Sequence, residues 1–182
     1  WASVEQNSFK EEIRSKNEEI ARLNREVANS VTGGDGFAYL VIGNIHPSKR
    51  VGFVTVVSRS EHPLYDVSAR IVNLDSLKNA SDTERDTISI DAHQESVKIG
   101  NLAPELAAQV TSWKLPSGEV HRYNVFFSAR NGLWTELLRI RKIDGEWEQA
   151  YKVVRNNEGE EKVLETKIPD GWPRNSDGKV EW

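Results

Sequence analysis

The spacing of hydrophobic residues divides the chain into two parts. From Ser3 to Ser30 apolar residues are few and regularly spaced among charged ones, whereas from Phe37 onward they form short runs that alternate with polar residues. The first pattern predicts a helix, and the second predicts β-strands. We therefore expect a long N-terminal helix over residues 1–32 and a mainly β domain over residues 37–182.

The apolar residues of the predicted helix fit a heptad repeat. Positions a and d hold five of them, with Lys16 interrupting the d row: Phe9, Ile13, Ile20, Leu23 and Val27. This stripe is too narrow to bury against a globular core, but β-branched residues at a with leucine at d favour a parallel two-stranded coiled coil. We therefore predict that these five residues mediate oligomerisation, with a second copy or with another helical protein. The alternative is a surface helix that folds back on its own domain.

The stretch "SVTGGDGFAYL" separates the two parts. Gly33 and Gly34 can adopt the positive φ that ends a helix, and Asp35 with Gly36 supplies turn chemistry. Residues 33–36 are therefore predicted to form a glycine hinge between the helix and the β domain. Such a hinge would give the domain rotational freedom.

The predicted strands are short and bounded by turn residues. They include "FAYLVIGNI", "VGFVTVVS", "DTISIDA", "VHRYNVFFSA" and "LWTELLRIRKI", and Asp144-Gly145 gives the strongest hairpin signal. Residues 105–110 fit a helical turn as well as a strand. Turn signals every ~8–12 residues favour an antiparallel immunoglobulin-like β-sandwich over a parallel sheet. The segment "PDGWPRNSDGKVEW" is predicted to be an irregular surface closure.

Composition excludes several classes of function. The net charge of −4 argues against nucleic acid as the main partner, and the absence of cysteine excludes disulfides and cysteine-based zinc sites. No apolar run approaches the ~20 residues of a membrane span. Because the chain starts at Trp1 and contains no methionine, the sequence leaves open the possibility of an upstream leader or membrane anchor.

The sequence offers little catalytic or metal-binding chemistry. It lacks a nucleophile motif and a phosphate loop, and we expect no cofactor. The best candidate cluster for a metal ion is Asp91 and His93 with Glu95. The sequence places too few further ligands nearby, so we do not predict a metal site. The four histidines are predicted to be solvated turn or edge residues. Asp66 and Glu136 are the carboxyl pair that a glycan hydrolase would need to hold in one cleft.

One constellation combines basic and aromatic residues. It consists of Arg130, Trp134, Arg139, Arg141, Trp147 and Tyr151. On a strand, Arg139 and Arg141 share one face, and we expect that face to be solvated while the opposite one joins the core. The constellation is a candidate surface for an acidic protein, a glycan or another ligand, although charged residues that protect a sheet edge would give the same pattern.

Parts of the chain resemble known modules. The segment "HPLYDVSARIVNL" and the later "IGNLAP" resemble bacterial immunoglobulin-like and fibronectin-like sandwiches. Together with "VTGGDGFAYL" and "FFSARNGLWTELLRIRKIDGEWEQAYKV", they resemble a family of uncharacterised bacterial proteins that joins an N-terminal helix, often after a membrane anchor, to a β-rich domain. The resemblance implies association with the bacterial cell envelope or membrane, and it implies no chemistry.

Three functions follow from these expectations. The leading one is a non-enzymatic binding module that is dimerised through its N-terminal helix and tethered to a membrane only through an upstream segment. The second is a structural spacer or assembly component of an envelope or phage-like complex. The third is a hydrolase that acts on a glycan or envelope polymer.

Overall fold

The structure is a computed structural model that describes residues 2–77, 94–157 and 159–182. It is mainly β, with two antiparallel sheets and one long N-terminal helix. Helix α1 covers Ala2–Thr32. The strands are β1 (Phe37–Gly43), β2 (Val51–Arg59), β3 (Leu64–Asn73), β4 (Gln94–Leu102), β5 (Ala107–Lys114), β6 (Val120–Ala129), β7 (Gly132–Ile143), β8 (Glu146–Asn157) and β9 (Glu160–Lys167).

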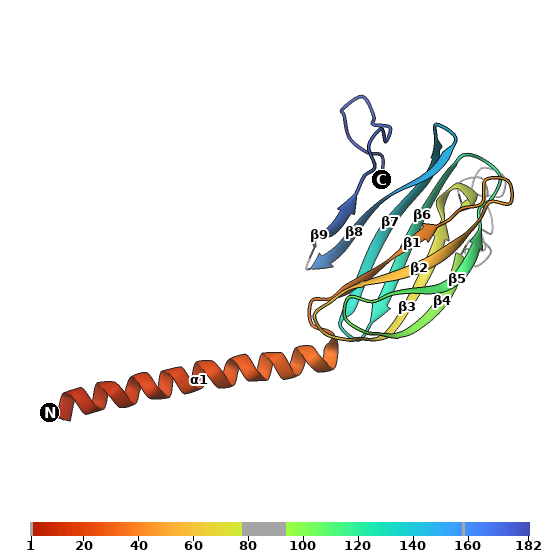
Figure 1. Cartoon of the computed structure of the whole chain (residues 1–182). Helices are drawn as coiled ribbons and strands as arrows, with labels where there is room; N and C mark the ends of the chain where they lie inside the picture. Colours follow the sequence, from red (N-terminus) through yellow and green to blue (C-terminus); the bar gives the residue numbers. More distant parts are fainter. Residues whose placement is uncertain (1, 78–93, 158) are drawn as a thin grey trace, which may run out of the picture.

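The strands form a large and a small sheet that pack face to face (Figure 1). The small sheet has the order β1-β2-β5, and the large sheet has the order β4-β3-β6-β7-β8-β9. All neighbouring strands are antiparallel, and β6 to β9 follow one another as a meander. This arrangement confirms the predicted β-sandwich. Residues 107–110 belong to β5, and residues 105 and 106 precede that strand without forming a helix. Asp144 and Gly145, both at positive φ, form the predicted turn between β7 and β8.

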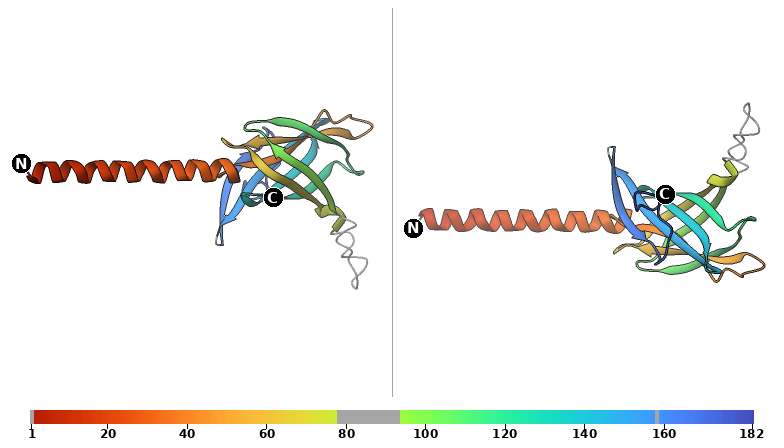
Figure 2. Two further views of the ribbon diagram at one scale, coloured as in Figure 1. Left: turned by 90° about the horizontal axis from the view of Figure 1, so that it is seen from below. Right: turned by 90° about the horizontal axis from the view of Figure 1, so that it is seen from above.

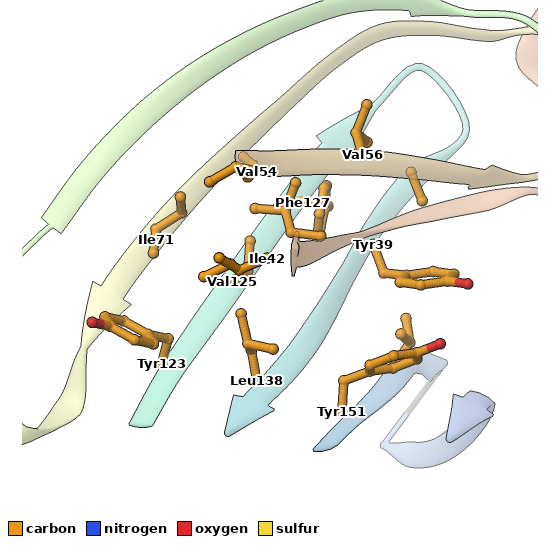
Figure 3. Packing of buried hydrophobic residues seen from close by; sticks show 14 of the residues in the cluster. Tyr39, Ile42, Val54, Val56, Ile71, Tyr123, Val125, Phe127, Leu138 and Tyr151 are labelled. Atoms are coloured by element: carbon orange, nitrogen blue, oxygen red, sulfur yellow. The ribbon is translucent and has the colours of Figure 1, made fainter. Parts of the chain in front are cut away.

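The core lies between the two sheets, because alternate side chains of each strand point inward. Figure 3 shows Val54 and Val56 of β2 facing Val125 and Phe127 of β6. The segment "DTISIDA", predicted as a strand, lies outside the described residues.

Side chains of the large sheet bind the free edge of β1. Strand β1 is the outer strand of the small sheet, so its second edge has no neighbouring strand in that sheet. Three side chains from β7 and β8 bond to this edge: Trp134 Nε1 donates to the Ala38 carbonyl (2.6 Å), Glu136 Oε2 accepts from the Leu40 amide (2.8 Å), and Gln149 Oε1 accepts from the Ile42 amide (2.9 Å). These three hydrogen bonds satisfy backbone groups of β1 that would otherwise be unpaired, because no strand adjoins this edge.

Helix α1 extends away from the sandwich (Figure 2). Every described side chain from Gln6 to Val31 is exposed, and the five heptad residues retain 44–64% of their accessible surface. The pairs Arg14–Glu18 and Arg22–Glu26 bridge successive turns on the helix surface. The alternative in which the helix folds back on its own domain is therefore wrong.

The glycine segment ends the helix where it meets the sandwich. The Gly33 amide donates to the Asn29 carbonyl (2.8 Å), and Gly33 and Gly34 adopt φ of 100° and 56°. These are left-handed conformations that glycine adopts at little cost. The glycines thus terminate the helix as the sequence indicates.

Several side chains of the sandwich also hold this segment. Asn131 Nδ2 donates to the carbonyls of Gly34 (2.9 Å) and Gly36 (2.7 Å), and Arg155 Nη2 donates to the Gly36 carbonyl (2.8 Å). Arg130 Nη1 donates to the Val31 carbonyl at the end of the helix (3.3 Å). These bonds oppose the rotational freedom expected of a glycine hinge, and the segment acts as a bonded joint.

Replacing Gly36 by alanine is expected to destabilise this joint. A Cβ at Gly36 would lie under 3.0 Å from the side chain of Ser60, and that side chain is buried. Overpacking of this kind typically costs about 1–3 kcal/mol. Gly43→Ala is the matched control, because a Cβ at Gly43 meets nothing within 4 Å. Chemical denaturation should show a loss of stability for Gly36→Ala well above that of Gly43→Ala; equal effects would contradict the tight fit.

Candidate interaction surfaces

The six residues of the predicted basic and aromatic surface lie in three places. Trp134, Trp147 and Tyr151 point between the sheets. Arg139 and Arg141 lie on the outer face of the large sheet, and Arg130 lies at the joint with helix α1. The structure therefore brings only Arg139 and Arg141 together.

Strand periodicity explains this division. On β7, Trp134, Glu136 and Leu138 share the inner face, while the odd-numbered residues point outward. Tyr151 of β8 faces inward and stacks on Tyr39 of β1, with the ring centroids 4.7 Å apart. The alternation of inward and outward positions along the strands could therefore have separated the aromatic residues from Arg139 and Arg141 at the level of sequence.

The C-terminal segment covers part of the outer face. Trp172 and Val180 pack on Ala150 of β8, and all three are buried. Arg139, which is the neighbour of Ala150 across the sheet, is only 5% exposed. The expectation that Arg139 is solvated is therefore wrong, because residues more than 30 positions along the chain fold over it.

A cavity of about 200 Å³ lies where this segment meets the sheet. Four arginines line it, two from β7, one from β6 and one from the C-terminal segment: Arg139, Arg141, Arg122 and Arg174. The one carboxyl group in its lining belongs to Glu181. Arg122 is already paired with Asp75, at 2.7 Å. The lining therefore carries more positive than negative charge.

Arg139 forms no salt bridge with a described residue, although the charges of Asp75 and Glu181 act on it from a greater distance. Its Nη1 donates to the carbonyls of Tyr123 (2.7 Å) and Leu138 (3.0 Å), and both Nη1 and Nη2 donate to Asn124 Oδ1 (3.4 Å each). Only its buried Nε has no hydrogen-bond partner in the structure. Burial, together with the neighbouring charge of Arg122, lowers the pKa of this guanidinium to about 10, while the charges of Asp75 and Glu181 oppose the shift. Arg122 and Arg139 lie directly opposite each other on β6 and β7, a placement that is unfavourable for like charges.

A larger hollow of about 620 Å³ occupies the uncovered part of the same outer face. Its lining includes Phe126 and Leu133, which are 36% and 69% exposed, and Arg70, whose guanidinium lies 4.7 Å from the centre of the Phe126 ring. An apolar patch with a cation at its side is suited to contact with another molecule.

The carboxyl pair considered for hydrolysis does not share a cleft. Glu136 is completely buried in the core, whereas the Asp66 side chain is 71% exposed and paired with Arg130 at 2.9 Å. Asp66 adopts a φ of 56°, which fits its predicted role at a strand corner.

The prediction for His121 is wrong. It points inward from β6, is 3% exposed and stacks on Trp147, with the ring centroids 5.6 Å apart. Burial lowers the pKa of its imidazole. As with Glu136, the alternation of side chains along the strand decides its burial.

Two further features bear on function. The part of the chain that the structure describes contains no group of three or more His, Asp or Glu side chains placed to hold a metal ion, and Asp91 and His93 lie outside that part. Among the described residues there is also no helix with both the length and the apolar character that crossing a membrane requires.

Comparison of the chain with protein-family models, with curated proteins and with solved structures finds no match.

Proposed function

We propose that this chain is a non-enzymatic binding module that pairs with a second copy through helix α1. The observation that carries the proposal is the uncovered heptad stripe: five apolar side chains follow one face of the helix, and the sandwich buries none of them. Helices in proteins gain most of their stability by packing an apolar face, and pairing would bury the stripe that the sandwich leaves exposed.

The sequence of the helix favours a second copy in parallel orientation. Ile13, Ile20 and Val27 at position a are β-branched, which suits a two-stranded parallel coiled coil. Glu12, Glu19 and Glu26 then occupy position g. An antiparallel pair would bring these two acidic rows together. In a parallel pair each of these glutamates instead lies beside the next e position of the partner helix. None of those e positions holds an acidic residue.

The bonded joint gives such a pair a defined shape. Because Asn131 and Arg155 hold the glycine segment, the two sandwiches would leave the coiled coil at fixed angles. When one domain has bound a target that carries repeated ligands, the second domain meets the next ligand at a high effective concentration, so the pair binds such a target more tightly than one domain does.

The wider assignment of the module rests on its sequence. We propose that the sandwich belongs with bacterial immunoglobulin-like and fibronectin-like modules and works at the cell envelope, supported by the resemblance of "HPLYDVSARIVNL" and "IGNLAP" to such modules. Fractionation of cells that produce the natural protein tests the location. Recovery in the envelope fraction is expected, and recovery in the soluble cytosolic fraction alone would contradict the proposal.

Replacing Ile20 by aspartate is expected to separate the pair. The change would place two charges in the middle of the apolar seam, and we expect the dissociation constant to rise about a hundredfold or more. Ser15→Asp is the matched control, because it adds the same charge at position c, away from the seam. Sedimentation equilibrium of the full chain measures both. Equal dissociation constants for the two variants would contradict pairing through this stripe.

A further inference from the structure

We propose that the cavity beneath the C-terminal segment binds a phosphate group, held by the guanidinium groups of Arg139, Arg141 and Arg174. Nothing in this inference depends on pairing of the helices, since a single chain carries the whole cavity. It adds a ligand chemistry to the binding module.

The charge of the cavity is unbalanced. Arg139, Arg141 and Arg174 form no ion pair with any described residue, and Glu181 is the one carboxyl group in the lining. Burying an arginine without a counter-ion is costly. A doubly charged anion would compensate the excess charge that the three guanidinium groups leave.

One buried donor of Arg139, its Nε–H, is left unused. Its side chain is 95% buried, because only 5% of its surface is exposed, and its Nε–H has no partner in the structure. Buried donors are nearly always satisfied in proteins. A donor left over beside a cavity that is lined by further arginines indicates that an acceptor from outside the chain completes the site.

The geometry and the size of the cavity suit a phosphate group. The arginines come from a strand of the sheet and from the C-terminal segment, so they approach the cavity from two sides. Guanidinium groups bind phosphate oxygens through parallel hydrogen bonds. A cavity of about 200 Å³ is smaller than the ~300–1,000 Å³ of sites for drug-sized ligands. It therefore fits a single anionic group, either free or at the end of a larger molecule.

Calorimetric titration of the full chain with inorganic phosphate, at neutral pH and constant ionic strength in chloride, tests the proposal. We expect saturable binding of one phosphate per chain. Arg141→Gln and Arg174→Gln should each weaken it about ten- to a hundredfold, because each removes a charge-assisted hydrogen bond. These two side chains are less buried than Arg139, so their replacement spares the buried part of the sheet.

Arg70→Gln is the matched control. Arg70 lies on the outer face of the same sheet but outside the cavity, and its replacement changes the net charge equally. Binding should be unchanged in this variant. Absence of saturable binding, or an equal loss in Arg70→Gln and Arg141→Gln, would overturn the proposal.

A second titration with glycerol 3-phosphate distinguishes the sources of the group. Tighter binding than that of inorganic phosphate assigns the cavity to a phosphate monoester, and weaker binding assigns it to the free anion. Failure of both ligands to bind, with helix pairing intact, would overturn the phosphate site and leave the proposed pairing untouched.

Discussion

Glu136→Gln is expected to make the sandwich more stable at pH 8 and to remove most of the pH dependence of its stability above pH 6.5. Glu136 is completely buried, and burial raises the pKa of its carboxyl group from 4.5 to about 8. Its Oε2 accepts a hydrogen bond from the Leu40 amide, which opposes that rise only in part. Glutamine keeps an oxygen for this amide and carries no charge.

The sign of the effect follows from proton binding. Between pH 4.5 and 8 the folded chain keeps the proton on Glu136, whereas the unfolded chain releases it. The free energy of unfolding therefore falls as the pH rises through this window and levels off above it. The whole change is about 5 kcal/mol, since one pKa unit corresponds to about 1.4 kcal/mol. His121 acts in the opposite direction below pH 6.5, because burial lowers the pKa of its imidazole.

Urea denaturation at a series of pH values between 6.5 and 8.5 measures this difference. The stability of the natural sequence should decline across the range, while that of Glu136→Gln should stay nearly level. Glu160→Gln, which changes an exposed residue at the start of β9, is the control and should follow the natural sequence. Parallel curves for Glu136→Gln and the natural sequence would show that the buried carboxyl group does not titrate as described.

Trp134→Ala is expected to cost about 3–5 kcal/mol, the usual range for a buried aromatic side chain. The Trp134 side chain is 2% exposed and stacks on Phe127, with the ring centroids 5.4 Å apart. It also donates the 2.6 Å hydrogen bond that satisfies the Ala38 carbonyl on the free edge of β1. The variant therefore loses core packing and one of the three bonds that join β1 to the large sheet.

Two further variants separate these contributions. Trp134→Phe keeps a ring against Phe127 but removes the donor, and it should cost about 1–2 kcal/mol. Leu133→Ala changes the neighbouring residue, which is 69% exposed on the outer face, and should stay within about 0.5 kcal/mol of the natural sequence. Thermal and urea denaturation measure all three. A loss for Trp134→Ala no larger than that for Leu133→Ala would contradict the role assigned to Trp134.

The sequence predicts the elements of the fold well, because their signals are local. The heptad spacing of Ile13, Ile20 and Val27 indicates the helix, and the glycines that end it need no tertiary context. Asp144-Gly145 fixes the turn between β7 and β8 through the conformations that these residues favour. The two-residue alternation of β7 contains the information that Glu136 faces the core beside Leu138.

Other features depend on contacts between distant parts of the chain. Arg139 is buried because Trp172 and Val180 pack on the neighbouring strand. The residues next to Arg139 in the sequence give no indication that this segment covers it. The support of β1 by Glu136 likewise requires two sheets to meet. Residues 33–36 show the same limit: their glycines predict a break in the helix, whereas the bonds from Asn131 and Arg155 that hold them come from about 100 or more positions along the chain.

The mass of the full chain in solution, measured by light scattering at several concentrations, tests the proposed pairing most directly. The account predicts a particle of twice the 20.6 kDa chain mass, and a particle of one chain for a version that begins at Gly33, which lacks the heptad stripe. A full chain that stays monomeric over the whole concentration range, or a version from Gly33 that remains dimeric, would contradict the claim that helix α1 pairs two copies of this module.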